Sequence, residues 1–162
     1  MNVVIVFAVL AVLLFGLAYF SKRRFGLLGL SLAAGSLLSG LWGYDAGLVV
    51  SGIGIFPKGS LTTAVTLSAI VLLPAILLLF HGYSYKGLIG RIVGATLFTL
   101  LALAFLVQPL GYALALEGFG VNIYQWLVAN RDTIISLGLV IAVVDLFLTK
   151  PAHNSENKKS KH

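Results

Sequence analysis

Long apolar runs separated by short polar segments make up most of the chain. Five of them approach the roughly 20 residues that a helix needs to cross a bilayer core. They cover residues 3–20, 25–43, 61–80, 88–110 and 133–148. The apolar positions are continuous instead of alternating, and backbone groups in lipid must be satisfied within their own segment. The pattern therefore predicts an all-α, polytopic membrane bundle with five transmembrane helices.

Three segments outside these runs complete the predicted organisation. Residues 44–60 are apolar and glycine-rich, which suits a re-entrant or interfacial segment or, as the favoured alternative, the end of the second helix and a turn. Residues 121–132 contain Tyr124 and Trp126, which suit the headgroup region, and are expected either to lie on the membrane surface or to run into the fifth helix. Residues 1–150 form a single transmembrane domain, and residues 151–162 are expected to be a disordered, basic cytoplasmic tail.

The basic residues are sorted to alternate loops. Nine of the 11 lysines and arginines lie in the first loop, the third loop or the tail. Lysine and arginine accumulate on the cytoplasmic side of membrane proteins, so five crossings with the N-terminus outside are predicted. The first run lacks a basic segment before it, which is the reverse of a secretory signal, so it is expected to be a retained anchor. We expect a multi-pass protein of the bacterial inner membrane.

The composition excludes several classes of protein. Hydrophobic residues make up 59% of the 162 residues, charged residues only 10%, and the mean hydropathy is +1.04. Such a chain cannot cover a water-facing surface, which excludes a soluble enzyme, a nucleic-acid-binding module and a disordered chain. The net charge of +6 is therefore assigned to membrane orientation. Because there are no cysteines, disulfides and thiolate chemistry are excluded.

Small residues in two of the predicted helices indicate close helix contact. Small side chains let another helix approach, because no bulky group intervenes. The second helix carries a row at every fourth position, and the fourth helix begins with a single GxxxG motif. These helix-packing candidates are Ser31, Gly35, Ser39 and Gly43, with Gly90 and Gly94 as their possible counterface. The sequence does not distinguish contact within the chain from contact between copies.

Two other positions are candidates for transport. Asp145 is a carboxylate within an apolar run, and intramembrane acids are functional candidates by default. It could instead reach the interface or pair with Lys150. Pro74 interrupts the third helix, with Thr66 among the hydroxyl residues nearby, so this helix could border a polar passage. An ordinary packing kink is the favoured interpretation of Pro74.

Catalytic, cofactor and metal sites are not expected. His81, His153 and His162 lack metal-ligand spacing, and neither a nucleophile elbow nor a nucleotide loop occurs. The basic clusters would face anionic lipid, where each charge is worth about 1 kcal/mol, although their role in fixing topology is sufficient to explain them. The residues assigned to lipid headgroups and topology are Lys22, Arg23, Arg24, Lys86 and Arg91.

Two short motifs resemble the colicin V production protein family. One is KRRFGLLGLSLAAGSLL after a charge-free first helix, and the other is KGLIGRIVGATLFTLL at the fourth. The matching positions are Arg23, Arg24, Gly26, Gly87, Gly90, Arg91 and Gly94, within about residues 1–110. Family members usually have an acidic residue after the basic turn and four spans, whereas this chain has no such acid and five predicted spans. The resemblance implies an inner-membrane protein associated with toxin or peptide export and envelope maintenance, with no settled biochemical activity.

The predicted function combines these features. We expect a non-enzymatic packing or interaction subunit, without cofactors, that supports toxin or peptide secretion or envelope homeostasis. Its partners would be the lipid bilayer and either another membrane protein or further copies of itself, and not nucleic acid. The alternative is a small oligomeric transporter or channel that uses Asp145 and the Pro74 helix.

Overall fold

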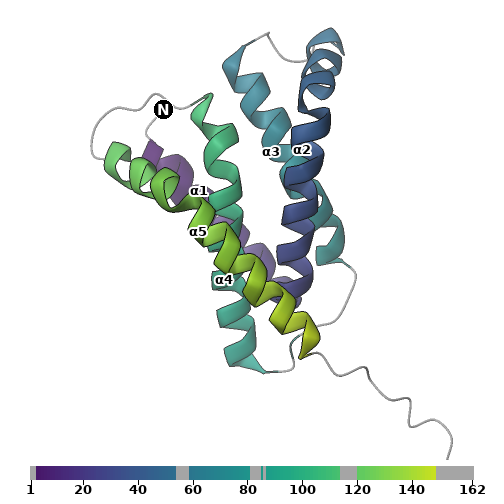
Figure 1. The fold of residues 1–162 in the computed structure, drawn as a ribbon, viewed down its shortest axis with the longest axis vertical. Helices are drawn as coiled ribbons and strands as arrows, with labels where there is room; N and C mark the ends of the chain where they lie inside the picture. The colour runs from purple at the N-terminus through teal and green to yellow at the C-terminus, as the bar shows by residue number, and fades with distance from the viewer. Residues whose placement is uncertain (1–2, 54–58, 81–84, 86, 114–119, 149–162) are drawn as a thin grey trace, which may run out of the picture.

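The computed structural model is all-helical and describes residues 3–53, 59–80, 85, 87–113 and 120–148. Its five helices are all long and apolar enough to cross a membrane, which confirms the predicted all-α fold at that level (Figure 1). They are α1 (Val3–Ser21), α2 (Phe25–Ile53), α3 (Ser60–Leu79), α4 (Leu88–Gly111) and α5 (Gly120–Phe147). Lys86 and Lys150, the three histidines, and the predicted tail lie outside the described residues.

Two helices are longer than their apolar runs, in agreement with the favoured alternative for residues 44–60 and with one of the two alternatives for residues 121–132. α2 continues ten residues past the expected end at 43, so residues 44–53 are helical and are the end of the second helix. α5 begins at Gly120 instead of 133, so residues 121–132 belong to the fifth helix. The polar residues that interrupt the apolar run do not break α5. Asn130 donates from Nδ2 to the Trp126 carbonyl at 2.8 Å, and Arg131 lies 3.5 Å from the Asp132 carboxylate.

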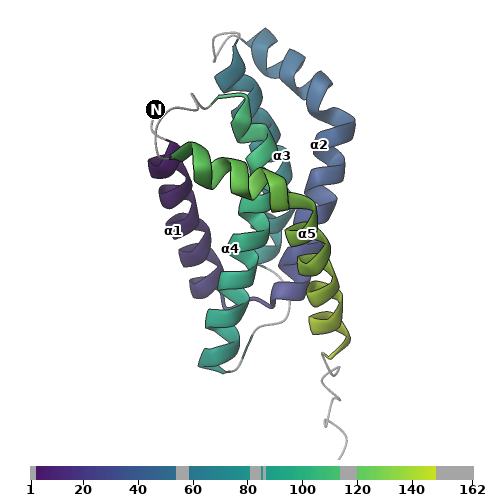
Figure 2. The same ribbon diagram turned by 60° about the vertical axis from the view of Figure 1, so that its left-hand side comes forward.

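Successive helices run in opposite directions, with α4 in the middle. Among the described helices, only α4 contacts all four of the others. The α2–α3 hairpin extends past the end of α4, so its far part is covered by no third helix (Figure 1). Figure 2 shows α5 bending: its first half lies across α4, and its second half turns to run beside the start of α2.

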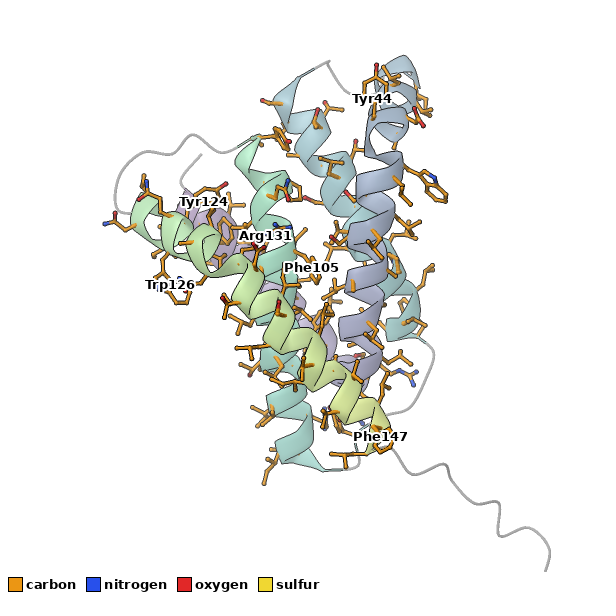
Figure 3. All side chains as sticks on the ribbon, viewed as in Figure 1. Tyr44, Phe105, Tyr124, Trp126, Arg131 and Phe147 are labelled. Atoms are coloured by element: carbon orange, nitrogen blue, oxygen red, sulfur yellow. The ribbon has the colours of Figure 1, made fainter. Side chains whose placement is uncertain are left out.

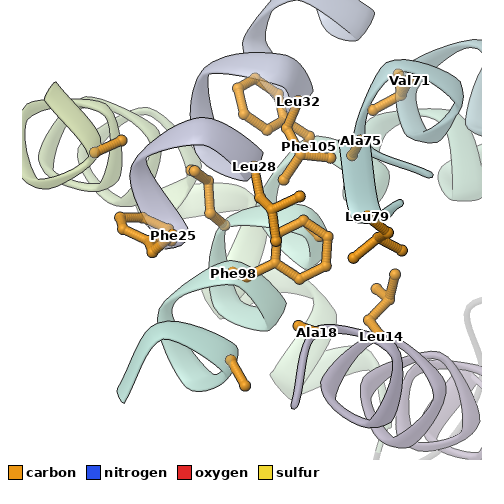
Figure 4. Close-up of a cluster of buried hydrophobic side chains, with 14 of the residues drawn as sticks. Leu14, Ala18, Phe25, Leu28, Leu32, Val71, Ala75, Leu79, Phe98 and Phe105 are labelled. Carbon is orange, nitrogen blue, oxygen red and sulfur yellow. The ribbon is translucent and has the colours of Figure 1, made fainter. Parts of the chain in front are cut away.

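The core lies where α1, α2, α3 and α4 meet. Its buried side chains recur at three- and four-residue spacing, which places them on one face of each helix. Figure 4 shows Leu14 and Ala18 of α1, Phe25, Leu28 and Leu32 of α2, Val71, Ala75 and Leu79 of α3, and Phe98 and Phe105 of α4. In lipid, such contacts stabilise the fold through close packing more than through exclusion of water.

The outside of the bundle is almost entirely apolar. In the most apolar 18-residue stretch of α1, and likewise in that of α5, only 11% of the residues are buried inside the bundle. Large hydrophobic side chains such as Val12, Phe20, Leu41 and Phe147 are between 72% and 90% exposed. A water-soluble monomer rarely exposes such a continuous surface, so these faces suit lipid or another membrane protein.

Candidate functional site

The small-residue row of α2 faces α3. A Cβ atom on Gly35 would overlap the carbonyl oxygen of Val71 and lie 2.8 Å from its carbonyl carbon, so two backbones meet there. A Cβ atom on Gly43 would clash with the Leu67 side chain. Ser31 is buried and donates to the Leu28 carbonyl of its own helix at 2.7 Å, while Ser39 is half-buried. Glycine at position 35 is therefore what allows α2 and α3 to touch.

The expected pairing of this row with Gly90 and Gly94 is wrong. These two glycines pack instead against the ring of Tyr85, which precedes α4. An added Cβ atom on Gly90 would lie 2.9 Å from Cδ1 of that ring, and one on Gly94 would lie 2.6 Å from Cε2. Two glycines one turn apart leave a flat groove on a helix, and a planar aromatic ring fills it as readily as a second helix does. The motif indicates a close contact but does not identify the partner.

A second set of glycines lies where α5 packs against α2 and α4. The row of small residues at every fourth position did not predict this contact. A Cβ atom on Gly26 would overlap the carbonyl oxygen of Ala142, and one on Gly29 would lie 3.0 Å from the Ala142 Cβ. A Cβ atom on Gly138 would lie 2.8 Å from Leu101 of α4. Since Ala142 is itself fully buried, small residues line both sides of the contact between α2 and α5.

Polar side chains gather at one end of the bundle, which we call the arginine end and define by Arg23, Arg24, Tyr85, Arg91 and Asp145. The C-termini of α1, α3 and α5 and the N-termini of α2 and α4 lie there. The turn between α1 and α2 passes through Lys22 in a left-handed conformation, with φ of 58°. Helix ends leave backbone groups without partners within the helix, and these must be satisfied by other groups.

Arg23 binds the C-terminus of α3. Its Nε donates to the Leu79 carbonyl at 3.0 Å, and its Nη2 donates to the Phe80 carbonyl at 2.8 Å. The positive guanidinium group therefore meets the negative end of the helix dipole. One side chain ties the loop after α1 to the end of α3, which is 56 residues away in the sequence.

Arg91 and Arg24 act in the same way on two other helices. Arg91 of α4 donates from Nη2 to the Tyr19 carbonyl near the end of α1 at 3.2 Å, and its guanidinium carbon lies 4.6 Å from the centre of the Tyr19 ring. Arg24 donates from Nη1 to the backbone carbonyl of Asp145 near the end of α5, at a longer 3.4 Å. Each of the three helices that end here thus receives an arginine from another element.

At the start of α2, oxygen acceptors bind the free backbone amides of the helix, whereas arginine donors bind the carbonyls at the helix C-termini. The amide of Phe25 donates to the Tyr85 hydroxyl at 3.2 Å, and the amide of Gly26 donates to Oδ2 of Asp145 at 2.9 Å. Oxygen acceptors at a helix N-terminus satisfy its free amides, and a carboxylate also suits the positive end of the helix dipole. Asp145 therefore caps α2 from the far end of the chain.

Tyr85 joins three elements at the arginine end. Its ring fills the groove of α4, its hydroxyl accepts from α2, and its backbone amide donates to the Lys22 carbonyl at 2.8 Å. Burial raises the pKa of its hydroxyl above the usual 10.0; the hydrogen bond from Phe25 acts against this, and the Asp145 carboxylate adds to it. The phenol is therefore held in its neutral form, in which it also has a proton to donate.

The predicted lipid-facing cations differ in their placement. Lys22 is exposed, as expected of a residue that faces headgroups. Arg23, Arg24 and Arg91 are half-buried and direct their guanidinium groups to backbone carbonyls of the chain itself. Their contribution inside the bundle is therefore to join helix ends, which a count of charges in loops does not reveal.

The predicted transport residues are not brought together. Asp145 lies at the arginine end, whereas Thr66 is buried in the other half of α3, beside an apolar groove bordered by Ala46 and Val50 of α2. Pro74 lies inside α3, which continues as a helix on both sides of it. The transporter alternative gains no support from this placement.

Fold and site together define a helical bundle of the multi-pass membrane type, held at one end by capped helix termini. Among the residues that the structure describes, no group of three or more histidine, aspartate or glutamate side chains could hold a metal ion. No protein-family model, curated protein or solved structure matches the chain. The resemblance to colicin V production proteins stays a prediction.

Proposed function

We propose that this chain is a non-enzymatic subunit of an assembly in the bacterial inner membrane, with its arginine end in the cytoplasm. Its role is to present a rigid apolar surface to another membrane protein or a second copy of itself. In line with its resemblance to colicin V production proteins, the process served is peptide or toxin secretion or envelope homeostasis. The charge distribution supports the orientation, because Lys22, Arg23, Arg24 and Arg91 all lie at that end.

The far part of α2 carries the proposal. Gly40 and Gly47 lie two turns apart on one face of this helix, and added Cβ atoms there would meet nothing within 4 Å. On the same side of the helix, Leu37, Leu41 and Tyr44 are between 71% and 79% exposed. Alternating small and large residues on an open helix face provide the recesses and projections by which membrane helices pack.

Native co-purification in mild detergent tests this proposal. We expect the wild-type chain to travel with a stoichiometric membrane-protein partner or a second copy, and Gly40→Leu to lose it while keeping the wild-type thermal midpoint. Gly16→Leu on α1 is the matched control, because its Cβ position also meets nothing within 4 Å. A wild-type chain that purifies alone as a monomer contradicts the proposal. So does ion or solute flux in reconstituted vesicles that Asp145→Asn abolishes.

A further inference from the structure

A polar cavity of about 470 Å³ lies where the first half of α5 crosses the end of α4. It is at the opposite end of α4 from the arginine end. Its polar lining comes from Gln108 and Tyr112 on the α4 side and Tyr124, Arg131 and Asp132 of α5. Figure 3 labels Tyr124, Trp126 and Arg131 along this half of α5, with Trp126 projecting away from the bundle.

Arg131, which lines this cavity, has a hydrogen-bond donor that no described residue binds. Its Nε is buried and has no hydrogen-bond partner within the described part of the chain. Its Nη1 lies 3.5 Å from the Asp132 carboxylate, which is long for a charged hydrogen bond, and the Asp132 side chain is 94% exposed. Although the buried Nε is not itself accessible, the side chain is 29% exposed and lines the cavity, so the terminal nitrogens of its guanidinium group can donate to a ligand there.

Tyr124, which lies two turns before Arg131 on α5 and also lines the cavity, is held in place by several contacts. Tyr124 donates its hydroxyl proton to the Val107 carbonyl at 3.3 Å, and its hydroxyl occupies the space that a side chain on Gly111 would need. Its ring also meets Phe7 of α1 edge-on, with the ring centres 6.3 Å apart. The crossing of α4 and α5 is therefore fixed by contacts that do not use Arg131.

The length of α4 indicates how deep in the bilayer the cavity lies. Its 24 residues span about 36 Å, against roughly 30 Å of hydrocarbon in a bilayer. With the arginine end at one interface, the last turn of α4 reaches the headgroup layer of the other leaflet. Tyr112, Tyr124 and Trp126 are the residue types that collect at this depth.

We propose that this cavity binds the headgroup of a zwitterionic phospholipid, with the phosphate at Arg131 and the ammonium group at Asp132. The guanidinium fork matches the oxygens of a phosphate, and a carboxylate suits an ammonium group. Because Asp132 adjoins Arg131, it disfavours a ligand that carries only negative charge. The site should therefore prefer phosphatidylethanolamine to phosphatidylglycerol. The proposal rests on insertion of the chain in a bilayer but not on its having a protein partner.

Native mass spectrometry of the full chain in detergent, with defined phospholipids added, tests the site. We expect phosphatidylethanolamine to remain bound to the wild type, and Arg131→Gln to bind it roughly tenfold more weakly through loss of a charge-assisted hydrogen bond. Lys22→Gln removes an exposed cation from the opposite end and should leave binding unchanged. Asp132→Asn, at an exposed position, should abolish the preference over phosphatidylglycerol without affecting the fold.

The same experiment also has outcomes that overturn the lipid-headgroup proposal or that identify a different source of the ligand. Equal binding of diacylglycerol, which has no phosphate, overturns the proposal, and so does equal retention by the wild type and Arg131→Gln. If glycerophosphoethanolamine, which has no acyl chains, binds as tightly as the lipid, then the headgroup chemistry stands and the source is a soluble phosphodiester. If Arg131→Gln does not fold, an unchanged lipid preference in Asp132→Asn overturns the proposal by itself.

Discussion

Replacing Gly35 with leucine should lower the thermal midpoint of the detergent-solubilised protein by on the order of 10 °C, or prevent folding. A Cβ atom at this position overlaps the backbone carbonyl of Val71, and backbone cannot rotate away as a side chain can. Overpacking in a core typically costs 1–3 kcal/mol, and roughly 3 kcal/mol corresponds to a shift of this size. Gly35→Ala should show the same effect more weakly, since its one methyl group already meets Val71.

The matched control is Gly40→Leu on the same helix. No atom lies within 4 Å of the Cβ position at Gly40, so the same substitution should leave the thermal midpoint within about 2 °C of wild type. Circular dichroism measured during heating gives both values. If Gly35→Leu melts with the wild type, then α2 and α3 do not touch at this position.

Replacing Arg23 with glutamine should destabilise the bundle by about 1–2 kcal/mol. The substitution removes two charge-assisted hydrogen bonds to the carbonyls of Leu79 and Phe80, and partial exposure of the group reduces their value. It also removes the positive charge from the end of the α3 dipole. Thermal unfolding in detergent measures the loss, and there the orientation of the chain in a membrane has no influence.

Lys22→Gln shows whether the stability lost in Arg23→Gln comes from helix capping or from the loss of one positive charge. It removes one positive charge from the same turn, but Lys22 is exposed and its side chain caps no helix end among the described contacts. We expect little change in stability from Lys22→Gln. Arg23→Lys should recover only part of the loss, because an ammonium group lacks the fork that reaches two carbonyls at once. Equal destabilisation by Arg23→Gln and Lys22→Gln would mean that charge alone is responsible.

The hydrophobic pattern predicts the helices well where apolar runs end in polar or turn-forming residues. The ends of α1, α3 and α4 lie within one residue of the expected positions. α2 and α5 are longer because residues that dilute the hydrophobicity do not break a helix. Asp45 is exposed within α2, and Asn130 bonds back to its own helix. Hydropathy reports which residues suit hydrocarbon, whereas helix length depends on backbone bonds.

The arginine end was less predictable because its contacts join residues far apart in the sequence. The pattern of charges identified Arg23, Arg24 and Arg91 as a group but assigned them to membrane topology and lipid headgroups. Their carbonyl partners are backbone atoms, which carry no signal in the sequence. Tyr85 was missed altogether, although an aromatic residue just before a GxxxG motif is a signal that could have found it.

Labelling of single cysteines in intact cells tests most directly whether the chain crosses the membrane five times. The chain contains no native cysteine, so Asn2→Cys, Lys22→Cys and Lys158→Cys each give one unambiguous site. A membrane-impermeant maleimide should label Asn2→Cys in intact cells, and should label Lys22→Cys and Lys158→Cys only after the membrane is permeabilised. Labelling of Asn2→Cys and Lys158→Cys from the same side would contradict five crossings and the position proposed for the arginine end.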